Sequence, residues 1–352
     1  MPRLLGRLAA AGSLAAAFLA PAFAQQPAKP ALPPIDPAKA RLDQTVTGLD
    51  GPGFGIAANE EAGMLAAACE GGTVQCWNKD VSMGVRVGER TAGVLKGHKG
   101  PVTALAWHGG RLASAGADGK VILWAMPGGK PLHTLTAKGP VRALALSPDG
   151  KQVAAAGDDP AVQLWDTESG KPGEKLAGHT DWVLSLAYSG DGKLLASGGY
   201  DGTVKVWEAA SGKKLLDVPA LPPAPKNAPE RPANVVQALA FSPDGKLLAV
   251  GGSDAAVHLF SVPDGKFIRS LAGHASSVTA LVFHPGGAVL ASGSKDRTVR
   301  LWNPANGQAL KSLEGHTAWV QGVVFLAQGT RLASAGADQT VRLWDLTPEP
   351  KK

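Results

Sequence analysis

Apolar and polar positions alternate in short runs through most of the chain, and turn residues separate the runs. The stretch GHTDWVLSLAYSGDGKLLASGGYDGTVKVW, residues 178–207, shows the pattern most fully. Residues 182–188 alternate, SGDG suits a type I turn with a glycine at positive φ, and residues 193–199 predict a second strand. TVKVW predicts a third strand and residues 213–218 a fourth. The pattern therefore predicts a four-stranded antiparallel meander of about forty residues.

This unit recurs along the chain, as the aromatic residue that ends each predicted third strand shows. Seven such residues follow one another at intervals of 47, 41, 42, 53, 42 and 42 residues: Trp77, Trp124, Trp165, Trp207, Phe260, Trp302 and Trp344. Self-similarity at this period predicts small sheets repeated radially around an axis. The chain from about residue 54 onward thus holds seven copies of the unit.

Two dipeptides recur with the same period. Gly-His occurs before the first strand of four copies, and Trp-Asp ends two third strands. The residues are Gly97-His98, Gly178-His179, Gly273-His274 and Gly315-His316, and then Trp165-Asp166 and Trp344-Asp345. With this spacing the chain resembles the WD-repeat β-propellers. The resemblance implies an all-β fold, a seven-bladed β-propeller of four-stranded antiparallel sheets.

The last copy lacks an outer strand, because only TPEPKK follows its third strand. The segment RLDQTVT at 41–47 resembles the outer strands of other copies, such as ALKSL at 309–313. In the family an N-terminal strand pairs with the last blade and removes the open sheet edges. The resemblance thus implies a propeller over 41–347 that is closed by 41–47, with a tail at 348–352.

The first 24 residues have the pattern of a secretory signal peptide. Arg3 and Arg7 precede an apolar stretch, and Ala-Phe-Ala ending at Ala24 supplies the small residues of a cleavage site. A membrane anchor would need about twenty unbroken apolar residues, and Pro21 with the polar residues after it argues against one. We expect cleavage after Ala24, a periplasmic or secreted protein, and no stable membrane insertion afterwards.

Two proline-rich segments interrupt the repeats. Residues 25–40 carry five prolines without periodicity and predict an extended, disordered linker. Residues 219–234 replace the short connection between the fourth and fifth copies, and their six prolines predict a stiff, polar insertion. The insertion could be a lid, a partner-binding arm or a tolerated loop.

Four repeats share a histidine, a serine, an aspartate and a tryptophan. The serine precedes the aspartate by four residues, and the aspartate precedes the tryptophan by six. The sets are His98, Ser114, Asp118 and Trp124; His179, Ser197, Asp201 and Trp207; His274, Ser292, Asp296 and Trp302; and His316, Ser334, Asp338 and Trp344. The resemblance implies that each set is a buried structural hydrogen-bond chain. A hydrolase triad is the alternative, but a nucleophile is needed once, in a cleft, and these sets occur four times.

Two repeats are partial copies that keep the turn aspartate and lack the serine and the Gly-His dipeptide. The residues at these positions are Lys138, Gly139, Ala155, Asp159 and Trp165 in the third repeat, and Val250, Asp254 and Phe260 in the fifth. We expect these two blades to be locally softer. The histidines outside the sets are predicted to be solvated and not metal ligands, because none has a second ligand at a chelating spacing: His108, His133, His258 and His284.

The first repeat, about 54–96, departs furthest from the pattern: it lacks Gly-His, has Gly71 in place of the aspartate, and carries both cysteines. The hairpin around EGGTVQ is expected to put Cys69 and Cys76 on one face, either opposite or one diagonal step apart. That placement and an oxidising compartment allow a disulfide. Two small buried thiols are the alternative.

The resemblance also implies a docking face, formed by the loops from outer to inner strand and from second to third strand. The residues expected there as partner-binding candidates are Trp182, Trp319, Tyr200, Lys295, Asp158, Ser253 and Glu70. Exposed tryptophan and tyrosine are favoured interface anchors. Trp182 and Trp319 could instead pack against neighbouring loops.

Composition narrows the function. The formal charge of +6 falls to +4 when Arg3 and Arg7 are removed, and the basic residues are scattered, so we expect no nucleic-acid binding. No nucleophile elbow, HExxH motif or phosphate-binding loop is present in the sequence, and no metal or cofactor is expected.

We therefore expect an exported, monomeric, non-catalytic scaffold for protein partners. One alternative is an accessory subunit of a periplasmic redox complex, linked to c-type cytochromes, or of a transport complex. A small-molecule enzyme such as a lactonase would need acidic residues and a metal at the channel.

Overall fold

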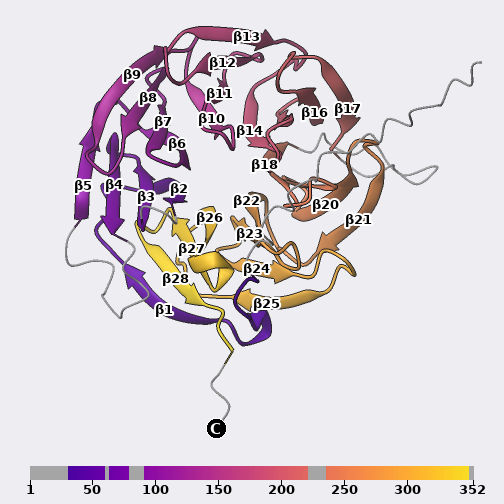
Figure 1. Ribbon diagram of the computed structural model, residues 1–352. Coiled ribbons are helices and arrows are strands. Elements are labelled where there is room, and N and C mark those ends of the chain that lie inside the picture. The colour runs from indigo at the N-terminus through magenta and orange to yellow at the C-terminus, as the bar shows by residue number, and fades with distance from the viewer. Residues whose placement is uncertain (1–30, 60–62, 79–90, 221–234, 349–352) are drawn as a thin grey trace, which may run out of the picture. The chain divides into compact units, whose positions relative to one another are not determined.

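The computed structural model describes residues 31–59, 63–78, 91–220 and 235–348. Within the unit from Leu32 onward, its strands form seven four-stranded antiparallel sheets arranged in a ring (Figure 1). We label the four strands of each sheet a, b, c and d, in order from the central axis to the rim. The fold is thus the seven-bladed propeller that the repeat period predicts.

The blades follow one another around the ring in chain order. Blade one contains β2 (Gly53–Asn59), β3 (Met64–Cys69), β4 (Thr73–Asn78) and β5 (Thr91–Lys96), and blade two contains β6 (Val102–His108), β7 (Arg111–Gly116), β8 (Lys120–Ala125) and β9 (Lys130–Thr136). Blade three contains β10 (Val141–Leu146), β11 (Gln152–Gly157), β12 (Val162–Asp166) and β13 (Pro172–Leu176), and blade four contains β14 (Val183–Tyr188), β15 (Leu194–Gly199), β16 (Thr203–Glu208) and β17 (Lys214–Pro219).

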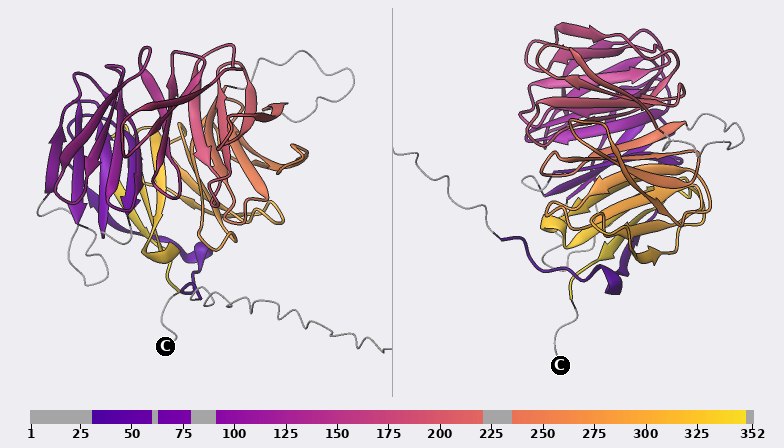
Figure 2. Two further views of the ribbon diagram at one scale, coloured as in Figure 1. Left: turned by 45° about the horizontal axis from the view of Figure 1, so that its top comes forward. Right: turned by 90° about the vertical axis from the view of Figure 1, so that its right-hand side faces the viewer.

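Blades five to seven complete the ring. Blade five contains β18 (Val236–Phe241), β19 (Leu247–Gly252), β20 (Ala256–Ser261) and β21 (Phe267–Ala272), and blade six contains β22 (Val278–Phe283), β23 (Leu290–Ser294), β24 (Val299–Trp302) and β25 (Ala309–Leu313). Blade seven contains β26 (Val320–Leu326), β27 (Arg331–Gly336), β28 (Val341–Asp345) and, as its outer strand, β1 (Arg41–Val46). Seen from the side, the strands run from one face of the ring to the other (Figure 2).

Turn residues set the strand boundaries, as blade four shows. In the turn between β14 and β15, Gly192 has φ +72°, a conformation that favours glycine. The Ser189 hydroxyl lies 2.7 Å from Asp191 Oδ1, and the Leu194 amide donates to the same hydroxyl at 2.9 Å. These local hydrogen bonds satisfy the turn and start β15 in register.

In the described ranges, the core consists of seven apolar clusters, most of them lying between adjacent blades. Between blades two and three, for example, Ala113 and Leu123 pack with Val153 and Trp165. Small alanines on strand b let neighbouring sheets approach, and the buried aromatic residues of strand c, tryptophan in six blades and Phe260 in blade five, fill the wider space toward the rim. Trp302 and Trp344 are among the largest fully buried side chains. Close packing of this kind makes the ring a rigid support for its loops.

Hydrogen bonds also join neighbouring blades near the axis. The Thr103 hydroxyl of β6 lies 2.6 Å from the carbonyl oxygen of Val141 at the start of β10. Thr279 of β22 makes the same contact with the carbonyl oxygen of Val320 in β26. These hydrogen bonds join blade two to blade three and blade six to blade seven at equivalent positions of strand a.

The ring closes through its first strand. β1 pairs antiparallel with β28, with Val46 opposite Val341, and Arg41 forms an ion pair with Asp345. In Figure 1 the indigo β1 lies beside the yellow β28. The closing strand was expected at 41–47, and the structure confirms it.

The segment before β1 is also held against the ring. The 3-10 turn η1 (Pro37–Lys39) precedes β1, the Asp36 amide donates to the Leu346 carbonyl at 2.8 Å, and Ala40 is buried. Ile35 packs on the same cluster. The expectation of a disordered linker through residue 40 was therefore wrong for its last residues, because they bury apolar side chains against the last two blades.

Several expected segments lie outside the described residues. They are the signal peptide at 1–24, the linker up to residue 30, and the proline-rich insertion from residue 221 to 234. Among the described residues, no helix has the length and apolar character required to cross a membrane.

Candidate functional site

The four expected sets are assembled as hydrogen-bond chains, and blade six shows the geometry. The indole Nε1 of Trp302 donates to Ser292 Oγ at 2.8 Å, and that oxygen lies 2.7 Å from His274 Nε2. The Nδ1 atom of His274 lies 2.7 Å from Asp296 Oδ2, which also accepts the amide of Ala275. An ionised aspartate can only accept hydrogen bonds, so His274 Nδ1 carries the proton. His274 Nε2 then accepts the hydrogen bond of the Ser292 hydroxyl.

The same three contacts recur in blades two, four and seven, with histidine, serine, aspartate and tryptophan from the predicted positions. The side chains of all four histidines are 1% exposed. Each chain ties the loop before strand a to the turn between strands b and c and to the buried end of strand c. The structure thus brings together the residues of every set, as the resemblance implied.

Burial and hydrogen bonding determine the protonation state of the set in blade six. Burial lowers the pKa of His274, although Asp296 partly opposes this effect. Burial alone would raise the pKa of Asp296, but hydrogen bonds from Thr298, the Ala275 amide and His274 lower it to about 2. A neutral imidazole therefore faces an ionised carboxylate. The Ser292 hydroxyl is fully buried and engaged on both sides, so it is not presented to a substrate as a nucleophile would be.

Blade five contains a different polar chain. His258 Nε2 lies 2.6 Å from Asp254 Oδ2, and His258 Nδ1 lies 2.8 Å from Ser270 Oγ. The histidine comes from strand c and not from the loop before strand a, and it is 2% exposed. The expectation of a solvated His258 was wrong, because the turn aspartate and a strand d serine satisfy its ring inside the sheet.

His284 is also buried, contrary to expectation. Its side chain packs edge-on against Phe325 at 5.2 Å, and its Nδ1 accepts the Gly286 amide at 2.9 Å. Its Nε2 is buried and has no hydrogen-bond partner within the described part of the chain. Burial lowers the pKa of His284. Of the other two histidines, His108 is exposed, and His133 is half-buried with Nε2 2.9 Å from the Glu168 carbonyl.

In blade one, a residue from an earlier loop replaces the missing turn aspartate. A Cβ on Gly71 would lie 2.3 Å from the carboxylate of Asp50. That carboxylate accepts the Thr73 hydroxyl at 2.9 Å, and the Gly71 amide donates to the Asp50 carbonyl. In blade six, Thr298 makes the same kind of contact with Asp296. Asp50 thus accepts the threonine hydroxyl in this turn of blade one, as the turn aspartate Asp296 does in blade six.

The cysteines lie on opposite faces of blade one, so the expectation of one shared face was wrong. The register pairs Cys76 with Ala66, three residues from Cys69, and successive side chains alternate between faces. Cys69 packs toward blade seven and Cys76 toward blade two. Both are buried free thiols, and burial raises the pKa of Cys76 to about 12. The geometry does not allow the disulfide.

Exposed aromatic side chains gather where blades three and four meet, on the face of the loops before strand a. Trp182 and Tyr200 are 38% and 44% exposed and pack edge-to-face at 5.5 Å. The Arg142 guanidinium lies 4.3 Å from the Trp182 ring, and Arg142 also forms an ion pair with Asp158. We call these four residues the blade-four cluster.

A related arrangement occurs where blades six and seven meet. Trp319 is 49% exposed, and Lys295 Nζ lies 4.7 Å from its ring. Trp319 occupies the position of Trp182, three residues after the histidine of its set. We call Trp319 and Lys295 the blade-seven cluster. In both places a cation from the preceding blade stacks on an exposed indole.

Two of the expected partner-binding residues lie outside these clusters. Glu70 is exposed in the turn between β3 and β4, and Ser253 accepts the Val235 amide at 3.0 Å. Sequence reasoning missed Arg142. Its signal was a cation at the start of strand a, where the corresponding positions of blades two and four carry Thr103 and Leu184.

Among the described residues that line the cavity on the axis, none is acidic. A cavity of about 240 Å³ on the axis is lined by the a strands, with Arg142, Gln237 and Gln321 among its polar residues and no aspartate or glutamate. Within the described part of the chain, no group of three histidine, cysteine, aspartate or glutamate side chains could hold a metal ion. The acidic metal site that a lactonase would need is not formed by these residues.

Seven four-stranded sheets around a channel, locked by repeated polar chains, define a β-propeller of the repeat type. The family model WD40, described as WD domain, G-beta repeat, matches residues 89–125, 129–166, 170–208, 265–303 and 307–345. These matches cover more than half of the chain, which belongs to the WD40 repeat family.

A second model, Anaphase-promoting complex subunit 4 WD40 domain, matches residues 224–279. No match was found among curated proteins. WD40 propellers commonly serve as protein-interaction scaffolds.

Proposed function

We propose that this propeller is an exported, non-catalytic platform that binds a protein partner on the face formed by the loops before strand a and between strands b and c. The supporting observation is the pair of exposed clusters on this face. Each presents a tryptophan beside a cation from the preceding blade, and aromatic residues and arginine are the side chains that most often carry interface energy.

The arrangement of each cluster favours binding. Arg142 holds the Trp182 ring from one side and Tyr200 contacts it edge-on, so the indole loses little freedom when a partner covers it. The support underneath is rigid, because the His179 set lies directly behind the loop that carries Trp182. Export rests on the N-terminal pattern of Arg3, Arg7 and the Ala24 cleavage site, and sequencing the N-terminus of the mature protein tests it.

Site-specific photo-crosslinking in the native cell tests the partner face. A photoreactive residue at Tyr200 should give a discrete adduct, and Trp319→Ala should reduce that adduct about tenfold, as expected for a hot-spot residue. The matched control carries the photoreactive residue at Leu132, which is 41% exposed on the outer strand β9. Equal adducts at both positions, or no effect of Trp319→Ala, would show that the partner does not use this face.

A further inference from the structure

Blade three lacks the histidine of the repeated set because its loop before strand a is one residue shorter. GHKGPV at 97–102 in blade two corresponds to AKGPV at 137–141 in blade three. The serine is also absent: Ala155 pairs with Gln163, as Ser114 pairs with Ile122 in blade two. Two side chains are thus missing from a place that four other blades fill.

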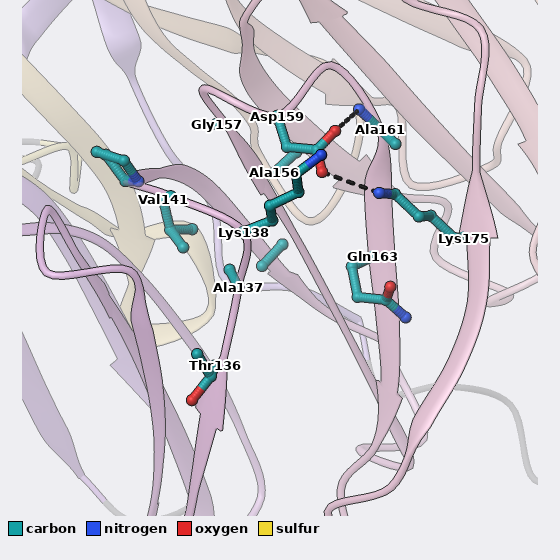
Figure 3. Close-up of a pocket in the computed structure, with 13 residues that line it drawn as sticks. Thr136, Ala137, Lys138, Val141, Ala156, Gly157, Asp159, Ala161, Gln163 and Lys175 are labelled. Carbon is teal, nitrogen blue, oxygen red and sulfur yellow. Dashed lines mark hydrogen bonds and ion pairs between the residues drawn. The ribbon is translucent and has the colours of Figure 1, made fainter.

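A cavity of about 150 Å³ occupies this place. Its wall consists of the loop from Thr136 to Val141, strand b at 155–157, and the side chains of Asp159, Gln163 and Lys175 (Figure 3). An engineered cavity of similar volume in another protein binds benzene, so a five-membered ring fits the space.

The aspartate of the set is retained at one end of the cavity. Asp159 Oδ1 accepts the Ala161 amide at 3.1 Å, as Asp296 Oδ1 accepts the Thr298 amide in blade six. The other oxygen, which in blade six accepts the imidazole, is held by Lys175 Nζ at 2.9 Å. The Lys175 side chain is 48% exposed and can turn into solvent at little cost, since an exposed ion pair contributes little.

The tryptophan of the set is retained as well. Trp165 is 4% exposed and packs in one cluster with Ala155, which stands where Ser292 accepts the indole N–H of Trp302 in blade six. A carboxylate thus remains at the position that holds the histidine ring in the intact sets, and Ala155 lines the cavity where those sets carry their serine. Lys138 and Lys175 add positive charge around Asp159, which disfavours a cationic ligand.

We propose that this cavity binds a neutral imidazole group, inserted where four other blades carry a histidine of their own. The ligand's N–H donates to Asp159, and its second nitrogen faces Ala155, where the intact sets carry a serine. The group comes either from a free imidazole compound or from a histidine side chain of a polypeptide. The site stands independently of the proposed partner face.

Titration of imidazole at pH 8, followed by amide and indole NMR shifts, tests this site. We expect saturable shifts at residues 137–141, Asp159 and the Trp165 indole, with a dissociation constant of about 1–10 mM, which suits so small a ligand. 1-Methylimidazole, which has no N–H, should bind at least about tenfold more weakly if one charged hydrogen bond is lost. Asp159→Asn should weaken imidazole binding in the same way.

Two variants control for the cavity itself. Insertion of a histidine between Ala137 and Lys138, combined with Ala155→Ser, rebuilds the set and should abolish binding. His179→Gly opens the corresponding space in blade four and should create a second imidazole site. If either variant fails to fold, the comparison with 1-methylimidazole in the unmodified protein still decides the question.

The source of the group is separated by two further ligands. Histamine tests a free imidazole compound, and the peptide acetyl-Gly-His-Gly-amide, with alanine in place of histidine as its control, tests a polypeptide side chain. Binding of either supports the proposal and assigns the source. The absence of saturable shifts with imidazole up to about 50 mM, well above the expected constant, would overturn it. Equal binding of imidazole and 1-methylimidazole would also overturn it.

Discussion

His258 Nε2 lies 2.6 Å from Asp254 Oδ2, four residues earlier in the chain, in a repeat that has no Gly-His dipeptide. In four other blades the turn aspartate meets a histidine that reaches it from the loop before strand a. In blade five the imidazole reaches the aspartate from strand c, and Ser270 satisfies its other nitrogen. The aspartate–imidazole contact is therefore kept although the histidine has moved to another strand.

His258→Ala should destabilise the protein by about 1–3 kcal/mol, because it removes a buried polar partner from Asp254 and Ser270. Urea unfolding followed by tryptophan fluorescence measures the change. His108→Ala, at an exposed position, serves as the control and should stay within about 0.5 kcal/mol. Equal effects of the two changes would contradict a structural role for His258.

Ser292→Ala should cost about 1–3 kcal/mol, because both the indole of Trp302 and the ring of His274 lose their buried partner. The reverse change, Ala155→Ser in blade three, places a hydroxyl beside Trp165 and should be neutral or stabilising by up to about 1 kcal/mol. Chemical unfolding of both variants checks the pair. A destabilisation by Ala155→Ser as large as that of Ser292→Ala would show that blade three lacks room for the hydroxyl.

Stability should decrease as the pH falls below about 6.5. Burial lowers the pKa of His179, His274 and His316 from the ordinary 6.5, so the unfolded chain binds protons at these sites before the folded protein does. Below about pH 4 a second loss should follow, because the pKa of Asp296 is lowered to about 2.

Melting temperatures between pH 8 and pH 3 measure this dependence. His316→Gln removes one of the shifted groups and should flatten the decrease between pH 7 and pH 5. A melting temperature that stays constant or rises over that interval would contradict the neutral state of the buried histidines.

Ring closure can be tested within one strand. Val46 is buried opposite Val341, and Val46→Ala should cost about 1–2 kcal/mol through lost burial. Leu42, on the same strand, is 43% exposed, and Leu42→Ala should stay within about 0.5 kcal/mol. Deletion of residues 41–47 should lower the melting temperature by more than either substitution. A deletion without effect would mean that the seventh sheet does not need its outer strand.

Both cysteines should remain thiols. Neither Cys69 nor Cys76 should react with Ellman's reagent at pH 8 in the folded protein, because both are buried and the pKa of Cys76 is about 12. Both should react once the chain is unfolded. An intact mass lower by two hydrogens under non-reducing conditions would contradict the observed register.

Most of the fold could be predicted because the same residue types recur at the same positions of successive repeats. The period of the strand c aromatic residues gave seven sheets, and the missing strand after Trp344 pointed to residues 41–47. The four polar sets were found because their members keep a constant spacing. In each case one residue type recurs at the same place in the local structure.

The features that the sequence did not reveal depend on residues that occupy a position in one repeat that no other repeat uses for the same contact. Asp50 replaces an aspartate at Gly71 from a different loop, and His258 replaces a loop histidine from a strand. Arg142 reaches an indole in the next blade. Spacing cannot reveal such exchanges, because they are set by the three-dimensional distance between strands. The error over the cysteines was of another kind, since it needed the register between β3 and β4, which the turn sequence alone did not fix.

The pairing of β1 with β28 joins the first strand of the propeller to its last. The ribosome delivers these two strands about 300 residues apart, so β1 has no partner until β28 has been synthesised. Nascent chains therefore expose this unpaired strand until β28 follows, and a premature stop codon before residue 341 leaves it open to aggregation.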